Sequence, residues 1–84
     1  MSAANRQNRK IITVDCRDLE PPEPLVKVLE AIEEMRNDEA VLMIHRKRPR
    51  LLFPKLREKG LSFSMTEAPD ESIELLIWRD KDNV

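Results

Sequence analysis

The chain has 84 residues, of which 37% are charged and 40% are hydrophobic, and its formal net charge is −1. A chain this short buries only about 60–65% of its unfolded surface, so we expect one domain with one core. No apolar run approaches the roughly 20 residues that cross a bilayer, and the polar segment Met1–Lys10 lacks the core of a signal peptide. The single cysteine excludes an internal disulfide and fits a reducing compartment. We therefore expect a cytoplasmic protein with no membrane partner.

The charge is divided between two parts of the chain. Residues 15–39 contain nine acidic and three basic residues. Residues 46–59 contain seven basic residues and a single acidic one, Glu58. The net charge near zero therefore hides an acidic half and a basic segment.

The first half of the chain predicts a strand followed by a helix. Residues 1–9 show no periodicity and are expected to be a disordered tail. Lys10–Cys16 predicts a strand, because four consecutive residues at its centre are β-branched. A helix is predicted from about Pro22 to Asn37, since proline is tolerated in a first turn and apolar residues then recur at helical spacing. These apolar residues are Leu25, Val28, Leu29, Ile32 and Met35.

The middle of the chain predicts a second strand and a second helix. Ala40–Ile44 is a continuous apolar run, typical of a strand buried on both faces. Leu51–Lys59 predicts a short helix that ends at Gly60. Pro54 is compatible with this helix only if it lies in or near the first turn.

Two further strands complete the predicted order β-α-β-α-β-β. Leu61–Thr66 alternates between apolar and polar residues, and Ser72–Arg79 is the last strand, before a polar tail at 81–84. Because β-α-β crossovers are right-handed, we expect both helices on one face of a mixed four-stranded sheet. The predicted fold is therefore a two-layer α/β (α+β) sandwich over residues 10–80. Its first two strands are parallel and its last two form a hairpin.

The segment from Asp15 to Pro24 resembles the Asp-x-Arg-Gly-Leu-x-Cys-Pro-x-Pro motif of the TusA/SirA sulfur carriers. In those carriers a persulfide-bearing cysteine precedes the Pro-x-Pro that opens the first helix, and Pro21 stands at that position here. Asp18 replaces the glycine of the carriers. The resemblance implies the same β-α-β-α-β-β fold and a link to redox or sulfur metabolism, and the missing thiol excludes relay through position 21.

The chain is more similar to a sister group of small domains of unknown function that carry proline in place of this cysteine. In that group a segment resembling His-x-x-x-Pro follows the second strand, and a tryptophan precedes a basic residue in the last strand. His45–Pro49 and Trp78-Arg79 match these features approximately. Arg46-Lys47-Arg48 departs from the acidic or neutral residues expected there.

Cys16 and His45 are the two weak candidates for chemistry. Both should lie at the carboxyl ends of parallel strands, the edge where α/β sheets usually bind ligands. A Cys/His pair can serve as a nucleophile and a base, or as two ligands of a shared metal. The alternatives are a buried apolar cysteine and a partly exposed histidine. No catalytic residue, resident metal or other cofactor is therefore assigned.

Three surfaces are candidates for binding a partner. One is the acidic edge of the first helix, with Glu23. Another is the basic loop, which contributes His45, Arg46, Lys47, Arg48 and Arg50. Nucleic acid is the weaker partner for this loop, because the chain has only three aromatic residues for stacking. On the outer face of the sheet, Leu76 and Trp78 are expected to face a partner, since tryptophan is enriched at interfaces.

The function predicted from the sequence is a non-catalytic protein-interaction or regulatory module on a sulfur-carrier-like scaffold. Its protein partner is unidentified, and a homodimer is one alternative. The competing functions are a sulfur or redox carrier that uses Cys16, and RNA or anion binding through the loop at 45–50.

Overall fold

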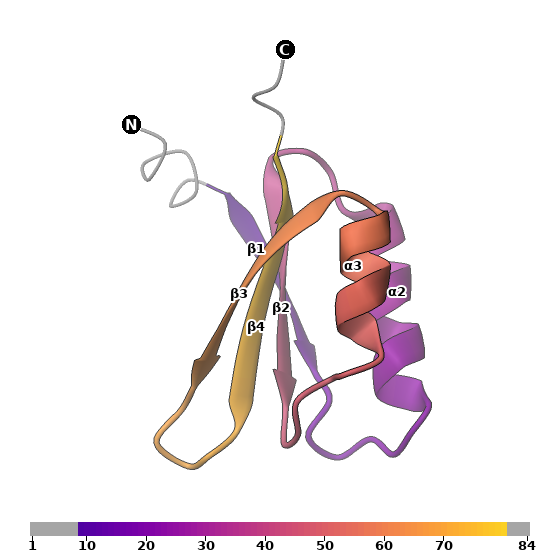
Figure 1. Ribbon diagram of the computed structural model, residues 1–84. Helices are drawn as coiled ribbons and strands as arrows, with labels where there is room; N and C mark the ends of the chain where they lie inside the picture. The colour runs from indigo at the N-terminus through magenta and orange to yellow at the C-terminus, as the bar shows by residue number, and fades with distance from the viewer. Residues whose placement is uncertain (1–8, 81–84) are drawn as a thin grey trace.

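The computed structural model describes residues 9–80 (Figure 1). The elements follow in the order β1 (Lys10–Asp15), α2 (Glu23–Glu34), β2 (Glu39–His45), α3 (Leu52–Glu58), β3 (Leu61–Glu67) and β4 (Ile73–Arg79). This confirms the predicted order β-α-β-α-β-β. Of the predicted tails, residues 1–8 and 81–84 lie outside the described residues. Arg9 donates hydrogen bonds from its guanidinium to the carbonyl oxygens of Asn37 (2.6 Å) and Arg79 (3.1 Å).

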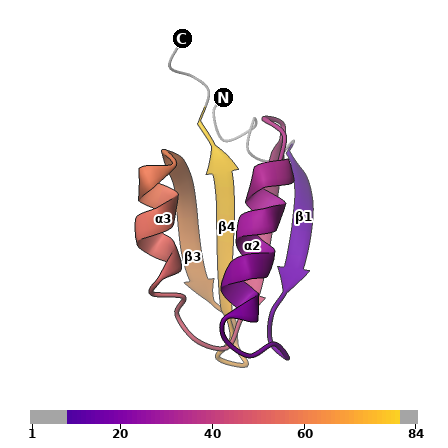
Figure 2. The ribbon, with the colours of Figure 1, turned by 90° about the vertical axis from the view of Figure 1, so that its right-hand side faces the viewer.

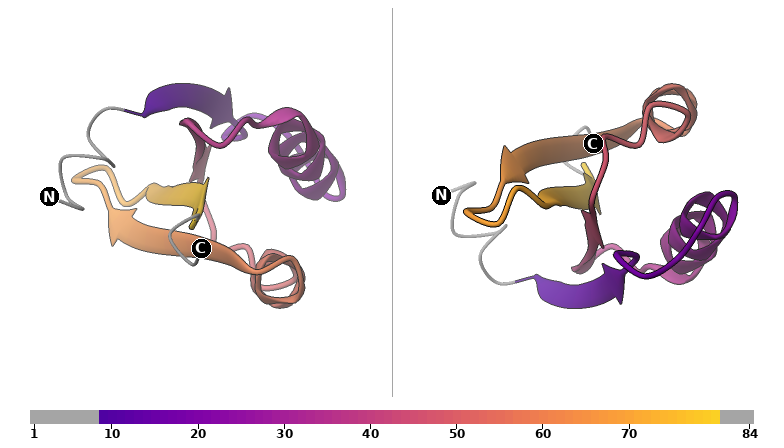
Figure 3. Two further views of the ribbon diagram at one scale, coloured as in Figure 1. Left: turned by 90° about the horizontal axis from the view of Figure 1, so that it is seen from above. Right: turned by 90° about the horizontal axis from the view of Figure 1, so that it is seen from below.

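The sheet has four strands in the order β1-β2-β4-β3. β1 and β2 are parallel, whereas β4 is antiparallel to both β2 and β3. Both helices lie on the same side of this sheet, and within residues 9–80 no helix covers its other side (Figure 3). The predicted two-layer sandwich, with parallel first strands and a terminal hairpin, is therefore confirmed.

The hydrophobic core lies between the helices and the sheet. Its sheet side is built from alternate residues of β2 and β4, and its helix side from the apolar stripes of α2 and α3. Each fully buried aliphatic side chain contributes about 1.5–3 kcal/mol relative to an exposed one. The most completely buried side chains are Val28, Ile32, Val41, Met43, Leu52, Leu56, Leu75 and Ile77.

Helix α2 ends at Glu34, earlier than the predicted stop at Asn37. The chain turns at Met35, which adopts an extended conformation (φ −68°, ψ 133°) and places its side chain in the core, 4% exposed. The last turn of α2 contains no basic residue. Instead, the Arg79 guanidinium reaches across from β4 and donates to the carbonyl oxygens of Ile32 (3.2 Å) and Met35. A cation from another element thus donates hydrogen bonds to carbonyl groups at the end of this helix, where intrahelical partners run out.

Helix α3 accommodates Pro54 as the sequence requires. The helix starts at Leu52, so Pro54 is its third residue and lies within the first turn, where no intrahelical N–H bond is lost. Gly60 follows the helix with φ +71°, a left-handed conformation that favours glycine. The predicted C-terminal cap is therefore confirmed.

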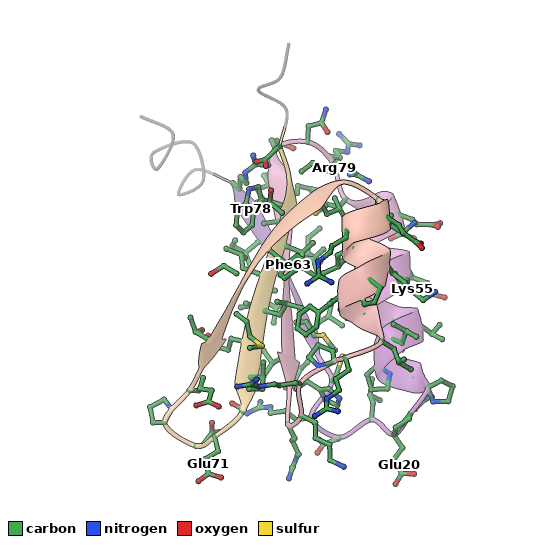
Figure 4. The ribbon with its side chains drawn as sticks, viewed as in Figure 1. Glu20, Lys55, Phe63, Glu71, Trp78 and Arg79 are labelled. Carbon is green, nitrogen blue, oxygen red and sulfur yellow. The ribbon has the colours of Figure 1, made fainter. Side chains whose placement is uncertain are left out.

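The outer face of the sheet carries Leu76 and Trp78. Leu76 is partly buried, and Trp78 is only 7% exposed. Trp78 stands between Ala40 and Ser62 of the neighbouring strands, and its Nε1 donates to Asp80 (3.2 Å). That these two residues form a partner surface stays a prediction, and the indole contributes little exposed area to it. Figure 4 shows Trp78 near the end of the sheet where β1 begins and β4 ends.

Candidate binding site at the carboxyl ends of the parallel strands

Three connecting segments meet at one end of the molecule. They are the β1–α2 junction, the loop between β2 and α3, and the turn between β3 and β4 (Figures 1 and 2). The backbone N–H of Cys16 donates to the carbonyl of Ile44 (2.7 Å), which holds the ends of β1 and β2 together. This is the edge at which the sequence placed its candidate chemistry.

An open groove of about 540 Å³ lies at this end. We call it the proline groove. One wall comes from the start of α2, the other from the loop between β2 and α3, and β2 and the first residue of α3 also contribute. The residues that line it are Pro21, Pro22, Pro24, Leu25, Met43, His45, Lys47, Arg48, Pro49, Arg50, Leu51 and Leu52.

The walls of the proline groove are apolar and its cations are not engaged elsewhere. Within residues 9–80, the side chains of Lys47, Arg48 and Arg50 make no hydrogen bond and no ion pair. No aspartate or glutamate lines the groove. Leu51, at 74% the most exposed large hydrophobic residue of the described chain, also lies on it. The groove therefore combines apolar contact area with an uncompensated positive charge.

His45 belongs to this groove, whereas Cys16 does not. The Nδ1 atom of His45 is buried without a hydrogen-bond partner within the described chain. Cys16 is 0% exposed and belongs to the core cluster, and its Sγ lies 3.8 Å from the carbonyl oxygen of Val14. Burial raises the pKa of the thiol above its ordinary value, and the charge of Asp15 raises it further. The alternative of a buried apolar cysteine is the one that the structure bears out.

The structure does not assemble a metal site around these two residues. Across residues 9–80, no three His, Cys, Asp or Glu side chains come together in a group that could hold an ion. A zinc ion bound by protein side chains usually has three or four of them as ligands. Cys16 and His45 therefore have no third protein ligand beside them in that part of the chain.

Arg46 points away from the other loop cations. Its Nε donates to the carbonyl oxygen of Arg17 (2.9 Å), and its Nη2 lies 3.8 Å from Asp18. With Asp70, Glu71 and Ser72 these three residues line a separate polar hollow of about 380 Å³. The cations of the predicted basic loop are therefore divided between two hollows. Arg46 lines the polar hollow, and Lys47, Arg48 and Arg50 line the proline groove.

An ion pair organises the start of the β1–α2 junction. The Arg17 guanidinium donates to both carboxylate oxygens of Asp15 (3.0 and 2.8 Å), and the Arg17 backbone N–H donates to the same carboxylate. These bonds lower the pKa of Asp15 to about 2. Both carboxylate oxygens of Asp15 are thus held by Arg17 on the surface of this junction.

The remaining predicted site residues lie elsewhere. Glu23 is the first residue of α2 and is exposed, but it does not line the groove. Leu76 and Trp78 lie on the outer face of the sheet. Sequence reasoning missed the apolar walls, above all Pro24, Leu25 and Met43, because the same residues fit the apolar pattern of a core. The sequence offered two signals for this groove. They are the prolines at positions 21, 22 and 24, and the hydrophobic residue Leu51 directly after the basic loop.

The fold and this groove define a small two-layer α/β domain with an apolar, cation-bordered groove beside the amino end of its first helix. The chain belongs to a family of uncharacterized conserved proteins, DUF2249, whose sequence profile matches residues 13–79. Neither the curated proteins nor the solved structures include a significant match to it. None of the helices in the described residues has the length and apolar character needed to cross a membrane.

Proposed function

We propose that this domain is a non-catalytic protein-interaction module that binds its partner in the proline groove. The observation that carries the proposal is the combination of apolar walls, an exposed Leu51 and three unengaged cations in one groove. Contiguous exposed apolar surface bordered by polar groups is typical of interaction sites. The function is therefore assigned to recognition.

Within residues 9–80, this end of the molecule has no accessible cysteine. Proline occupies position 21, where the similar TusA/SirA carriers hold their persulfide-bearing cysteine, and the thiol of Cys16 is buried in the core. A nucleophilic cysteine has to be accessible and is ordinarily activated by a lowered pKa, whereas the pKa of Cys16 is raised. On this proposal the scaffold has kept the binding end of a sulfur carrier and lost its reaction. A role in redox or sulfur metabolism is part of the proposal through that resemblance alone.

Site-specific photo-crosslinking in an extract of the native cells tests the proposal. A benzophenone amino acid replaces Leu51 in the groove, and in a matched control it replaces Val26, which is 48% exposed on α2 and does not line the groove. We expect a discrete crosslinked protein from position 51 that is absent from position 26. The proposal is wrong if the two positions give the same products.

A charge-reversed variant completes the test. Arg48→Glu together with Arg50→Glu should abolish the crosslink from position 51, because both guanidinium groups lie on the groove. The pair Lys55→Glu and Lys59→Glu changes the net charge by the same amount on exposed residues outside the groove, so its crosslink should persist. Figure 4 shows Lys55 on the outward side of α3.

A further inference from the structure

We infer that the occupant of the proline groove is an acidic peptide segment with an apolar side chain as its anchor, and this inference rests on the proposed function. The anchor would contact four apolar side chains that three elements bring together. Pro24 and Leu25 come from α2, Met43 from β2 and Leu52 from α3, and three of these four are buried. An apolar group gains free energy when it leaves water for this floor, and it brings no polar atom of its own that would need a partner.

The charge of the groove selects a negatively charged occupant. Lys47, Arg48 and Arg50 supply three positive charges, and no carboxylate among the lining residues compensates them. Arginine forms two parallel hydrogen bonds with a carboxylate, so Arg48 and Arg50 suit aspartate and glutamate side chains in particular. Carboxylates on both sides of an apolar anchor would complement this arrangement.

A peptide fits better than a nucleic acid. No aromatic residue lines the groove, so unpaired bases would have nothing to stack on. Asp18, Glu20 and Glu23 lie exposed in and after the adjoining β1–α2 junction and would repel a long phosphate backbone. The volume of about 540 Å³ also lies within the range of a site that encloses a few residues.

Selection from a library of displayed random 12-residue peptides tests the inference with a defined probe. The bait is the whole chain, and the counter-bait is the chain with Arg48→Glu and Arg50→Glu. We expect the recovered peptides to share one leucine, isoleucine, phenylalanine or methionine with at least two acidic residues within three positions of it. Circular dichroism of both baits establishes that the substitutions leave the fold intact.

Fluorescence anisotropy of a recovered peptide then measures what each part contributes. We expect about tenfold or greater weakening in the Arg48→Glu/Arg50→Glu variant, because two rim pairs are replaced by repulsions and each 1.4 kcal/mol is a factor of ten. Similar weakening is expected when the peptide's apolar anchor is replaced by serine. The Lys55→Glu/Lys59→Glu variant should bind within about threefold of the unmodified chain, and affinity should fall as salt rises.

Each other outcome overturns the inference. Recovered peptides without acidic enrichment, or peptides that bind both baits equally, contradict an acidic occupant. Failure to recover any peptide contradicts a peptide occupant, and so does groove-dependent binding of single-stranded RNA in the same anisotropy assay. The crosslink from position 51 separates these results from the proposed function, since a crosslinked protein with a neutral or basic contact segment leaves that function standing while refuting the inference.

Discussion

Labelling of Cys16 by a thiol reagent decides between the interaction module and the carrier that uses this cysteine. The side chain is 0% exposed within the core cluster, so the reagent reaches Sγ only when the structure opens. If opening requires global unfolding of a small domain, at about 5 kcal/mol, the labelling rate falls about 5,000-fold below that of the unfolded chain. A local opening at the end of β1 that costs about 2 kcal/mol still gives about 30-fold protection.

The raised pKa of Cys16 adds to this protection, since less thiolate is present at a given pH. The assay follows reaction with an aromatic disulfide reagent at pH 8, in buffer and in concentrated urea, with Cys16→Ala as the blank. Intact mass after incubation with a cysteine desulfurase and its cysteine substrate tests the chemistry directly, and we expect no persulfide. A native rate within threefold of the unfolded rate, or a persulfide on Cys16 that passes to an acceptor, would refute the reasoning from burial.

Two further predictions concern stability. Arg79→Ala removes both bonds to the last carbonyls of α2, so we expect a loss of about 2–3 kcal/mol in urea unfolding, with Lys59→Ala within about 0.5 kcal/mol of the parent as the control. An equal effect of the two substitutions would show that this tertiary cap is unimportant. Asp15 has its pKa lowered to about 2, so the stability from its pair with Arg17 is complete above about pH 4 and is lost as the pH falls through 2. Asp15→Asn should therefore lose less stability than the parent between pH 4 and 2, as measured by urea unfolding at each pH, and parallel curves would contradict this.

The order and faces of the elements could be predicted because they depend on neighbours in the chain. The β-branched run of β1 and the helical spacing of apolar residues in α2 are local patterns, and each survives in the structure. Val28 and Ile32 are buried as this spacing predicts. The position of Pro54 also followed from local sterics, because a helix tolerates proline in its first turn and is broken by it further along.

The predictions that failed or stayed incomplete concern side chains whose partners are distant in sequence. Trp78 alternates with core residues along β4, yet it is only 7% exposed where it stands between Ala40 and Ser62 of the adjacent strands. The sequence groups Arg46 with the other cations of the basic loop. In the structure Arg46 donates a hydrogen bond to the carbonyl oxygen of Arg17 and lines the separate polar hollow instead of the proline groove. Neither neighbour could be identified from periodicity.

By itself, then, the sequence determined the element order, the two-layer fold and the end of the sheet where binding was to be sought. The backbone geometry of consecutive residues is enough for that, because hydrophobic period and turn chemistry act over a few positions. Only the tertiary structure decided which side chains meet at that end. Residues 21–25 and 43–52 form one groove because the parallel pairing of β1 and β2 brings their carboxyl ends together, and the same packing encloses Cys16.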